Sequence, residues 1–110
     1  MEIKVSSKNF RREVTESSVP VVLEFYSAES TECRILDPVI SEIAAEYGRS
    51  IKLCKIDMDA EPDIAEEYNA FSAPMLVRLE GGDIVTWLES GDIISGSSVN
   101  EYEVKGIFEM

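Results

Sequence analysis

The chain has 110 residues and carries 22 acidic against 10 basic side chains, a net charge of −12, with no histidine. This length fits one domain, so we expect a single unit over residues 1–110. The acidity argues against nucleic acid as a partner, because phosphates would be repelled. Lack of histidine removes Ser-His-Asp and Cys-His nucleophile systems. Two cysteines, Cys33 and Cys54, are too few for a thiolate metal site, so we expect no metal and no cofactor.

No apolar run approaches the roughly 20 residues that are needed to cross a bilayer. The acidity also disfavours anionic membrane surfaces, so we expect no membrane partner. The segment Met1–Val5 has no basic region followed by an apolar stretch, which is the pattern of a secretory signal. If the chain starts at Met1, these features predict a cytoplasmic protein, and we expect it to be a monomer.

Two short strands are expected in the first quarter of the chain. Ile3–Val5 is the first candidate, and Ser6-Ser7 can cap a following helix that carries Val14 on its apolar face. Val21–Tyr26 is an apolar run of strand length with little alternation. Such a run is typical of a strand covered on both faces, as in a sheet between two layers of helices.

A long helix is predicted over Glu32–Tyr47, where apolar residues recur at the helical period. Gly48 is in the usual position to end it. Pro38 lies inside the pattern, where it removes one hydrogen bond and should kink the helix. Ile51–Asp57 then predicts a second central strand, and Pro62–Tyr68 a short helix with a proline in its first turn.

The last third predicts a hairpin and a helix. Met75–Leu79 and Ile84–Leu88 are strand candidates joined by a short glycine-rich turn. Gly91–Ser97 is expected to be a loop, and Ser98-x-x-Glu101 matches a capping box that would start the last helix. The order is therefore βαβαβαββα, which predicts an α/β fold: a central mixed sheet with helices on both faces.

Several segments in this order resemble one known family, the thioredoxins, over about residues 3 to 91; they are Val21–Ala28, Ile35–Ala44, Lys55–Asp59 with Ile64–Tyr68, Ser72–Met75 and Gly81-Gly82. The resemblance implies a thioredoxin-like fold and an ancestry among thiol-disulfide oxidoreductases. No single segment is decisive, but their order is specific.

The redox motif of that family has kept one of its two cysteines. Family members place Trp-Cys-Gly-Pro-Cys where this chain reads Glu29-Ser30-Thr31-Glu32-Cys33. The first cysteine attacks a substrate disulfide as a thiolate, and the second resolves the mixed disulfide. Ser30 holds the nucleophile's position, and a hydroxyl cannot form a disulfide. The dithiol cycle is therefore expected not to run between Ser30 and Cys33.

Two origins of Ser30 stay open, an introduced substitution and a natural loss. Thr31 and Glu32 also depart from the family pattern, which favours natural divergence. Two readings of Cys33 stay open as well. It is either an inert, partly buried thiol or a monothiol that forms mixed disulfides.

The resemblance gives roles to further residues. Glu24 holds the position of the buried acid that assists proton transfer at the resolving cysteine, and Lys55 that of its partner lysine. The alternatives are a retained proton relay and a structural glutamate whose charge is met by Lys55, and loss of the nucleophile favours the second. If Lys55 points toward Glu24, alternation sends Cys54 to the opposite face, as a small core residue. Trp87 is expected to pack or to lie partly exposed.

The resemblance also implies a binding groove. Pro74 in Ser-Ala-Pro-Met matches the family's cis-proline, and backbone before it pairs with an extended substrate peptide. A groove between Ser30, Ala73-Pro74 and the Gly91 loop would then hold a peptide or protein partner. Two main hypotheses of function follow: a thioredoxin-like redox protein whose dithiol cycle is inactive, and a non-catalytic binding module that uses this groove. A protein acting through Cys33 alone is the third.

Overall fold

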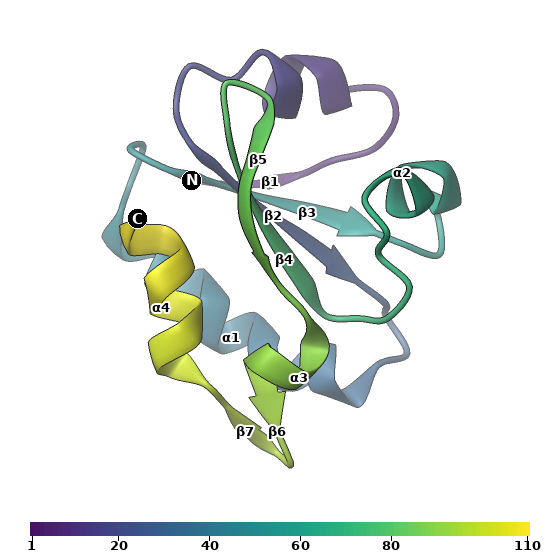
Figure 1. Ribbon diagram of the computed structural model, residues 1–110, viewed down its shortest axis with the longest axis vertical. Helices are drawn as coiled ribbons and strands as arrows, with labels where there is room; N and C mark the ends of the chain where they lie inside the picture. The colour runs from purple at the N-terminus through teal and green to yellow at the C-terminus, as the bar shows by residue number, and fades with distance from the viewer.

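The computed structural model describes residues 1–110 and is built on one five-stranded mixed sheet (Figure 1). Its spatial order is β1 (Glu2–Lys4), β3 (Lys52–Asp57), β2 (Val21–Tyr26), β4 (Met75–Glu80) and β5 (Asp83–Leu88). The first three strands run parallel, and β4 and β5 continue the sheet antiparallel. The α/β fold and mixed sheet predicted from the sequence are confirmed.

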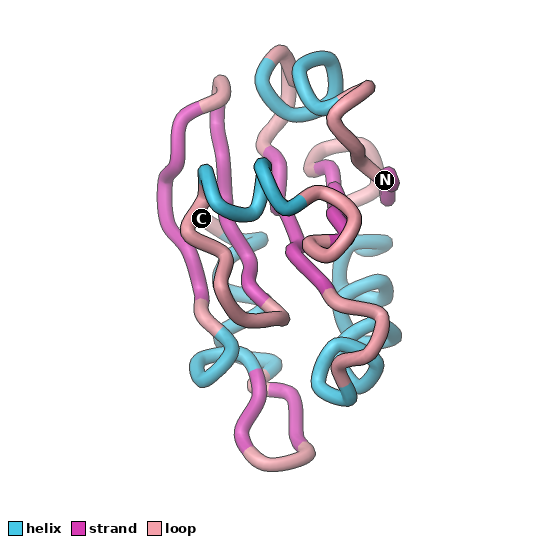
Figure 2. Tube along the Cα trace, turned by 90° about the vertical axis from the view of Figure 1, so that its right-hand side faces the viewer, coloured by secondary structure: helices cyan, strands magenta, loops and turns pink.

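The helices and a small hairpin complete the chain. They are η1 (Arg11–Thr15, a π-helical turn), α1 (Thr31–Glu46), α2 (Pro62–Glu67), α3 (Ser90–Ile93), β6 (Ile94–Ser95), β7 (Ser98–Val99) and α4 (Glu101–Glu109). Figure 2 shows the β6–β7 hairpin projecting beyond the end of the main sheet. No helix is both long enough and apolar enough to cross a bilayer.

Two hydrophobic cores lie on opposite faces of the sheet, because successive side chains of a strand point to opposite faces. One core joins Val22 and Leu53 to α1 and α4, through residues such as Leu36 and Phe108. The other contains Leu23, Phe25 and Cys54 together with residues of η1 and α2. Helices thus cover both faces, which explains the near-continuous apolar run of β2.

The predicted start of the last helix is wrong. Ser98 does not cap it; this residue pairs with Ser95 in the small hairpin, and α4 begins at Glu101 after Asn100. The reason is tertiary. The backbone N–H of Asn100 donates to the carbonyl of Ile93 at 2.7 Å and its side-chain amide donates to the Asp92 carbonyl at 3.1 Å, so the chain stays tied to α3 up to this residue.

Two other local expectations need correction. The predicted loop Gly91–Ser97 contains most of α3 and the strand β6. The helix expected after Ser6 forms only a turn and the π-helical segment η1, and the Ser6 hydroxyl accepts from the N–H of Lys8 at 3.2 Å rather than deeper in a regular helix. Pro38 does lie inside α1, as the sequence predicted.

Arg78 fastens the end of α4 to the sheet. Only 3% of this residue is exposed, and its guanidinium donates to the carbonyls of Ile107, Phe108 and Met110 at 2.9–3.0 Å. It also bonds the carboxylate of Glu80 at 2.9 Å. The last carbonyls of a helix have no partner within it, so one buried arginine here satisfies groups that would otherwise stay unpaired.

We expect Arg78→Leu to lower the free energy of unfolding by about 3 kcal/mol, because buried hydrogen bonds from a charged donor are lost together. Urea unfolding followed by circular dichroism measures this. Glu80→Gln is the matched control. The Glu80 side chain is 48% exposed, so we expect less than about 1 kcal/mol from its loss of charge. Equal effects of the two substitutions would contradict the conclusion that the bonds from Arg78 to the carbonyls of α4 stabilise the fold.

Candidate functional site

Ser30 is the residue that starts α1. Its backbone is extended (φ −79°, ψ 122°), and its hydroxyl oxygen accepts a hydrogen bond from the N–H of Cys33 at 3.2 Å. This is the usual geometry of a serine N-cap, which satisfies one of the unpaired amides at a helix start. Glu32 lies in the first turn, where a negative charge is favourable. The serine thus takes a structural role at the position where the family resemblance places a nucleophile.

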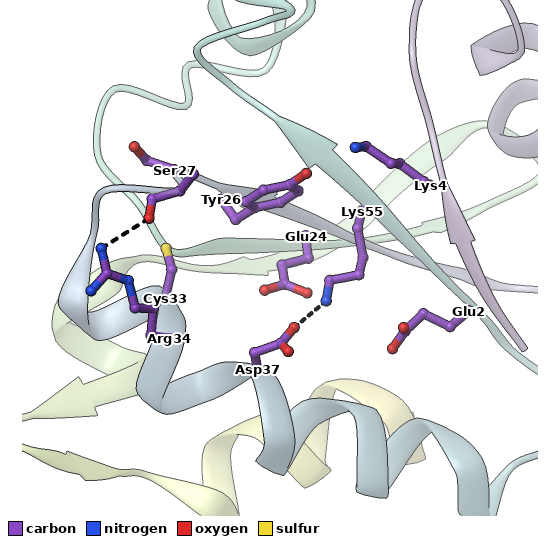
Figure 3. Close-up of a pocket in the computed structure, with 10 residues that line it drawn as sticks. Glu2, Lys4, Glu24, Tyr26, Ser27, Cys33, Arg34, Asp37 and Lys55 are labelled. Atoms are coloured by element: carbon purple, nitrogen blue, oxygen red, sulfur yellow. Dashed lines mark hydrogen bonds and ion pairs between the residues drawn. The ribbon is translucent and has the colours of Figure 1, made fainter.

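Cys33 is in the first turn of α1 and lies on the wall of an open cleft. The cleft measures about 630 Å³. Cys33 is only 5% exposed, and its sulfur points into the cleft beside Ser27 (Figure 3). The remaining lining residues are mostly charged or polar: Glu2, Lys4, Glu24, Tyr26, Ala28, Arg34, Asp37 and Lys55.

Glu24 lies at the inner end of this cleft, in the middle of the central strand β2. It is 1% exposed, and its Oε1 atom has no hydrogen-bond partner. Burial raises the pKa of Glu24 to about 7; the positive charge of Lys55 opposes this rise, and the negative charges of Asp37 and Glu2 add to it. The carboxyl can therefore hold or release a proton near neutral pH.

Lys55 is the neighbour of Glu24 on the adjacent strand β3, but its hydrogen-bonded partner is a different residue. Its amine pairs with the carboxylate of Asp37 on α1, as Figure 3 shows. Lys55 acts on Glu24 through its charge and not through a hydrogen bond. Burial alone would lower the pKa of Lys55, but the Asp37 bond and the charge of Glu24 raise it overall.

Sequence reasoning missed Asp37. This residue lies four positions after Cys33, so both side chains share one face of α1. That spacing is the feature of the sequence that could have placed Asp37 near Cys33. Asp37 draws the Lys55 amine toward the helix, which leaves Glu24 without a hydrogen-bond donor. No group of three or more potential ligand side chains is placed to hold a metal ion.

The other predicted site residues lie outside this cleft. None of Ser30, Ala73, Pro74 and Gly91 is on its wall. The Ala73–Pro74 peptide bond is cis, Ala73 is half-buried, and Gly91 is exposed in α3. The groove expected among these residues stays a prediction.

Cys54 lies on the opposite side of the sheet from Cys33, as alternation predicted. It is fully buried in the core formed with η1 and α2, and burial raises its pKa to about 11. Both cysteines are free thiols. The sheet lies between them, so they cannot form a disulfide with each other.

We expect Glu24→Gln to remove a pH dependence of stability. The carboxyl of Glu24 loses its proton near pH 4.5 in the unfolded chain but only near pH 7 in the fold, so stability falls as pH rises between these values, by roughly 3 kcal/mol. The free energy of unfolding of the glutamine variant should equal that of the parent at pH 4.5 and should exceed it by roughly 3 kcal/mol at pH 7.5. Urea unfolding at both pH values measures this, and parallel pH profiles would contradict it.

Asp37→Asn should lower the pKa of Glu24 below about 7, because it removes a nearby negative charge and releases the Lys55 amine. Titration of the Glu24 carboxyl carbon by NMR gives this value directly. Lys55→Met is the opposing variant, and we expect it to raise the same pKa. A shift in the same direction for both variants would show that the charges of Lys55 and Asp37 do not set the pKa of Glu24.

The comparisons with known proteins agree with this geometry. A family model named Thioredoxin matches residues 1–105. The chain is 39% identical to a thioredoxin of Pyropia yezoensis over 82 residues, which is 74% of this chain and 77% of that protein. It is 37% identical to thioredoxin 1 of Nostoc sp. over the same shares of each chain. It is also 40% identical to an M-type chloroplastic thioredoxin of Chlamydomonas reinhardtii, over 71% of this chain and 56% of that one. The chain therefore belongs to the thioredoxin family, which is related to thiol-disulfide oxidoreductases.

Proposed function

We propose that this protein is a member of the thioredoxin family whose dithiol-disulfide cycle does not run, so that its function does not depend on that cycle. The observation that carries this proposal is the N-cap of α1. The hydroxyl oxygen of Ser30 occupies the place where a nucleophilic sulfur would lie, and it bonds the N–H of Cys33 at 3.2 Å. The chain contains no histidine, so no imidazole base can activate the Ser30 hydroxyl as a nucleophile.

The electron balance of the cycle supports the same conclusion. Reduction of a substrate disulfide by this family requires two thiols, which give up two electrons and become a disulfide. Cys33 alone can only exchange into a mixed disulfide, and a second thiol must then resolve it. Cys54 cannot do so, because it lies in the core on the far side of the sheet. Exchange at Cys33 would therefore stop after its first step.

A second candidate is a peptide-binding module that uses the groove beside Ser30, Pro74 and Gly91. The observation that favours it lies at Ala73, which is half-buried and makes no hydrogen bond through its backbone N–H or carbonyl. Unpaired backbone at the start of β4 is suited to pairing with an extended peptide. In this reading the protein recognises a partner without chemical change.

Disulfide reduction driven by dithiothreitol distinguishes the candidates. We expect the parent to match the uncatalysed rate, and Ser30→Cys to exceed it by at least about tenfold, because a thiol at a helix N-terminus is stabilised as the thiolate. The matched control is Ser30→Cys combined with Cys33→Ser. It has the nucleophile without the resolving thiol and should lose the gain.

Two other outcomes carry distinct meanings. If Ser30→Cys folds but is inactive, a missing sulfur atom is not the only departure of this site from a working redox site. The peptide-binding module is then the favoured function. If the parent itself reduces the substrate and Cys33→Ser abolishes that activity, the proposal is overturned, and Cys33 is the centre of a one-thiol mechanism.

A further inference from the structure

A cluster of exposed apolar side chains lies on β5 and on the loop before β4, away from the cleft that holds Cys33. Phe71 is 77% exposed, Ile84 52% and Trp87 54%. They line one hollow of about 390 Å³, together with Met75 and Val77 of β4 and three residues beside them, Tyr68, Asn69 and Glu89. We call this hollow the Trp87 cleft. Single exposed apolar residues are ordinary, but three large ones around one hollow indicate a binding surface.

The strand β5, which carries Ile84 and Trp87, has an open edge. β5 is the last strand of the sheet and pairs only with β4. None of its backbone groups bonds a segment outside that ladder. The register with β4 shifts at Val85, which is one extra residue. This bulge places Ile84 and Trp87 on the same face and leaves Thr86–Leu88 as the regular part of the edge.

A second hollow lies on the other face of the same edge. It measures about 430 Å³ and contains Thr86 and Leu88 of β5, with Tyr102, Glu103, Lys105, Gly106, Ile107, Glu109 and Met110 of the last helix and the chain end. We call it the α4 cleft. Two of its side chains are carboxylates, whereas the Trp87 cleft has only Glu89. A strand added to β5 would direct alternate side chains into the two hollows.

The charge around this edge is mostly negative, and Lys105 is the one basic side chain that lines either cleft. Residues 56–104 carry 12 acidic side chains and a single basic one, Arg78, although the rest of the chain is nearly balanced. Arg78 is buried and occupied by Glu80 and the carbonyls at the end of α4. The two clefts together hold the carboxylates of Glu89, Glu103 and Glu109 against one amine, that of Lys105, so a cationic segment would be attracted to this edge.

We infer that the free edge of β5 binds an extended segment of a partner protein in which apolar and basic residues alternate. The segment adds a sixth strand at Thr86–Leu88. Its apolar side chains enter the Trp87 cleft beside Phe71, and its basic side chains enter the α4 cleft beside Glu103 and Glu109. Main-chain hydrogen bonds supply affinity in this mode, and the two hollows supply specificity.

A second copy of this chain fits the same edge less well. Two copies would bring together surfaces that both hold the acidic excess of residues 56–104, and like charges oppose such pairing. The bulge at Val85 also interrupts the ladder that a symmetric pair of β5 strands would need. Bulges are a common protection against edge-to-edge association.

The test uses the single tryptophan of the chain as its probe, since Trp87 lies in the cleft itself. A ten-residue peptide that alternates valine and lysine is titrated into the intact protein, up to about 1 mM, the weak end of useful affinity. We expect a saturable shift of the Trp87 emission to shorter wavelength, with amide shifts in NMR spectra confined to β5 and its two clefts. Binding should weaken as salt is added.

Two variants and two altered peptides supply the controls. Phe71→Lys and Glu103→Lys should each weaken binding by at least about tenfold. Ala45→Lys makes the same change of charge as Phe71→Lys, on the exposed face of α1, and should have no comparable effect. A peptide with glutamate in place of lysine should not bind, and methylation of alternate backbone nitrogens should abolish strand pairing.

Several results would overturn the inference. These are equal binding of the lysine and glutamate peptides, no emission shift up to the highest concentration, amide shifts centred on Ala73 instead of β5, and equal effects of Phe71→Lys and Ala45→Lys. A dimer in sedimentation that is broken by Phe71→Lys would assign the edge to a second copy instead. The test does not depend on position 30, so it stands apart from the redox proposal.

Discussion

The central strand β2 is hydrogen-bonded along both of its edges, to β3 on one and to β4 on the other. The apolar side chains of Val21, Val22, Leu23 and Phe25 are confined to the two cores, and Glu24 is buried among them in the same strand. A carboxylate in this run cannot reach bulk water by moving aside. Glu24 instead lies at the inner end of the cleft beside α1, and the arrangement of the Lys55 and Asp37 charges follows from that confinement. Burial of this one group costs stability that the surrounding apolar packing offsets.

The first two turns of α1 combine structure and chemistry in a small space. Ser30 caps the helix, Cys33 lies on the cleft wall, and Asp37 holds the lysine that would otherwise approach Glu24. A serine at the start of α1 supports this architecture, because a serine oxygen is a good cap. The fold depends on the cap and the two cores, whereas a dithiol cycle needs a second thiol in this first turn.

Most of the fold could be predicted because its signals are local. The apolar runs Val21–Tyr26 and Ile51–Asp57 gave two central strands, and alternation placed Cys54 on the far face from Cys33. The failures are tertiary. The start of α4 is fixed by hydrogen bonds from Asn100 to α3, and the Lys55–Asp37 pair joins a strand to a helix. Neither bond has a trace in local sequence. The bulge at Val85, which gathers Ile84 and Trp87 on one face, is equally invisible to a pattern of period two.

The serine cap also bears on what a cysteine at position 30 would cost the helix. A cysteine sulfur is a weaker acceptor than a serine oxygen, so cysteine at position 30 would give up part of the cap, and a lost cap typically costs about 1 kcal/mol. The stability of α1 therefore favours serine over cysteine at this position. Glu29 and Glu32, which would disfavour a thiolate beside them, add a second barrier. A cysteine at this position would therefore meet two costs at once, a weaker cap for α1 and two nearby negative charges that oppose its ionisation.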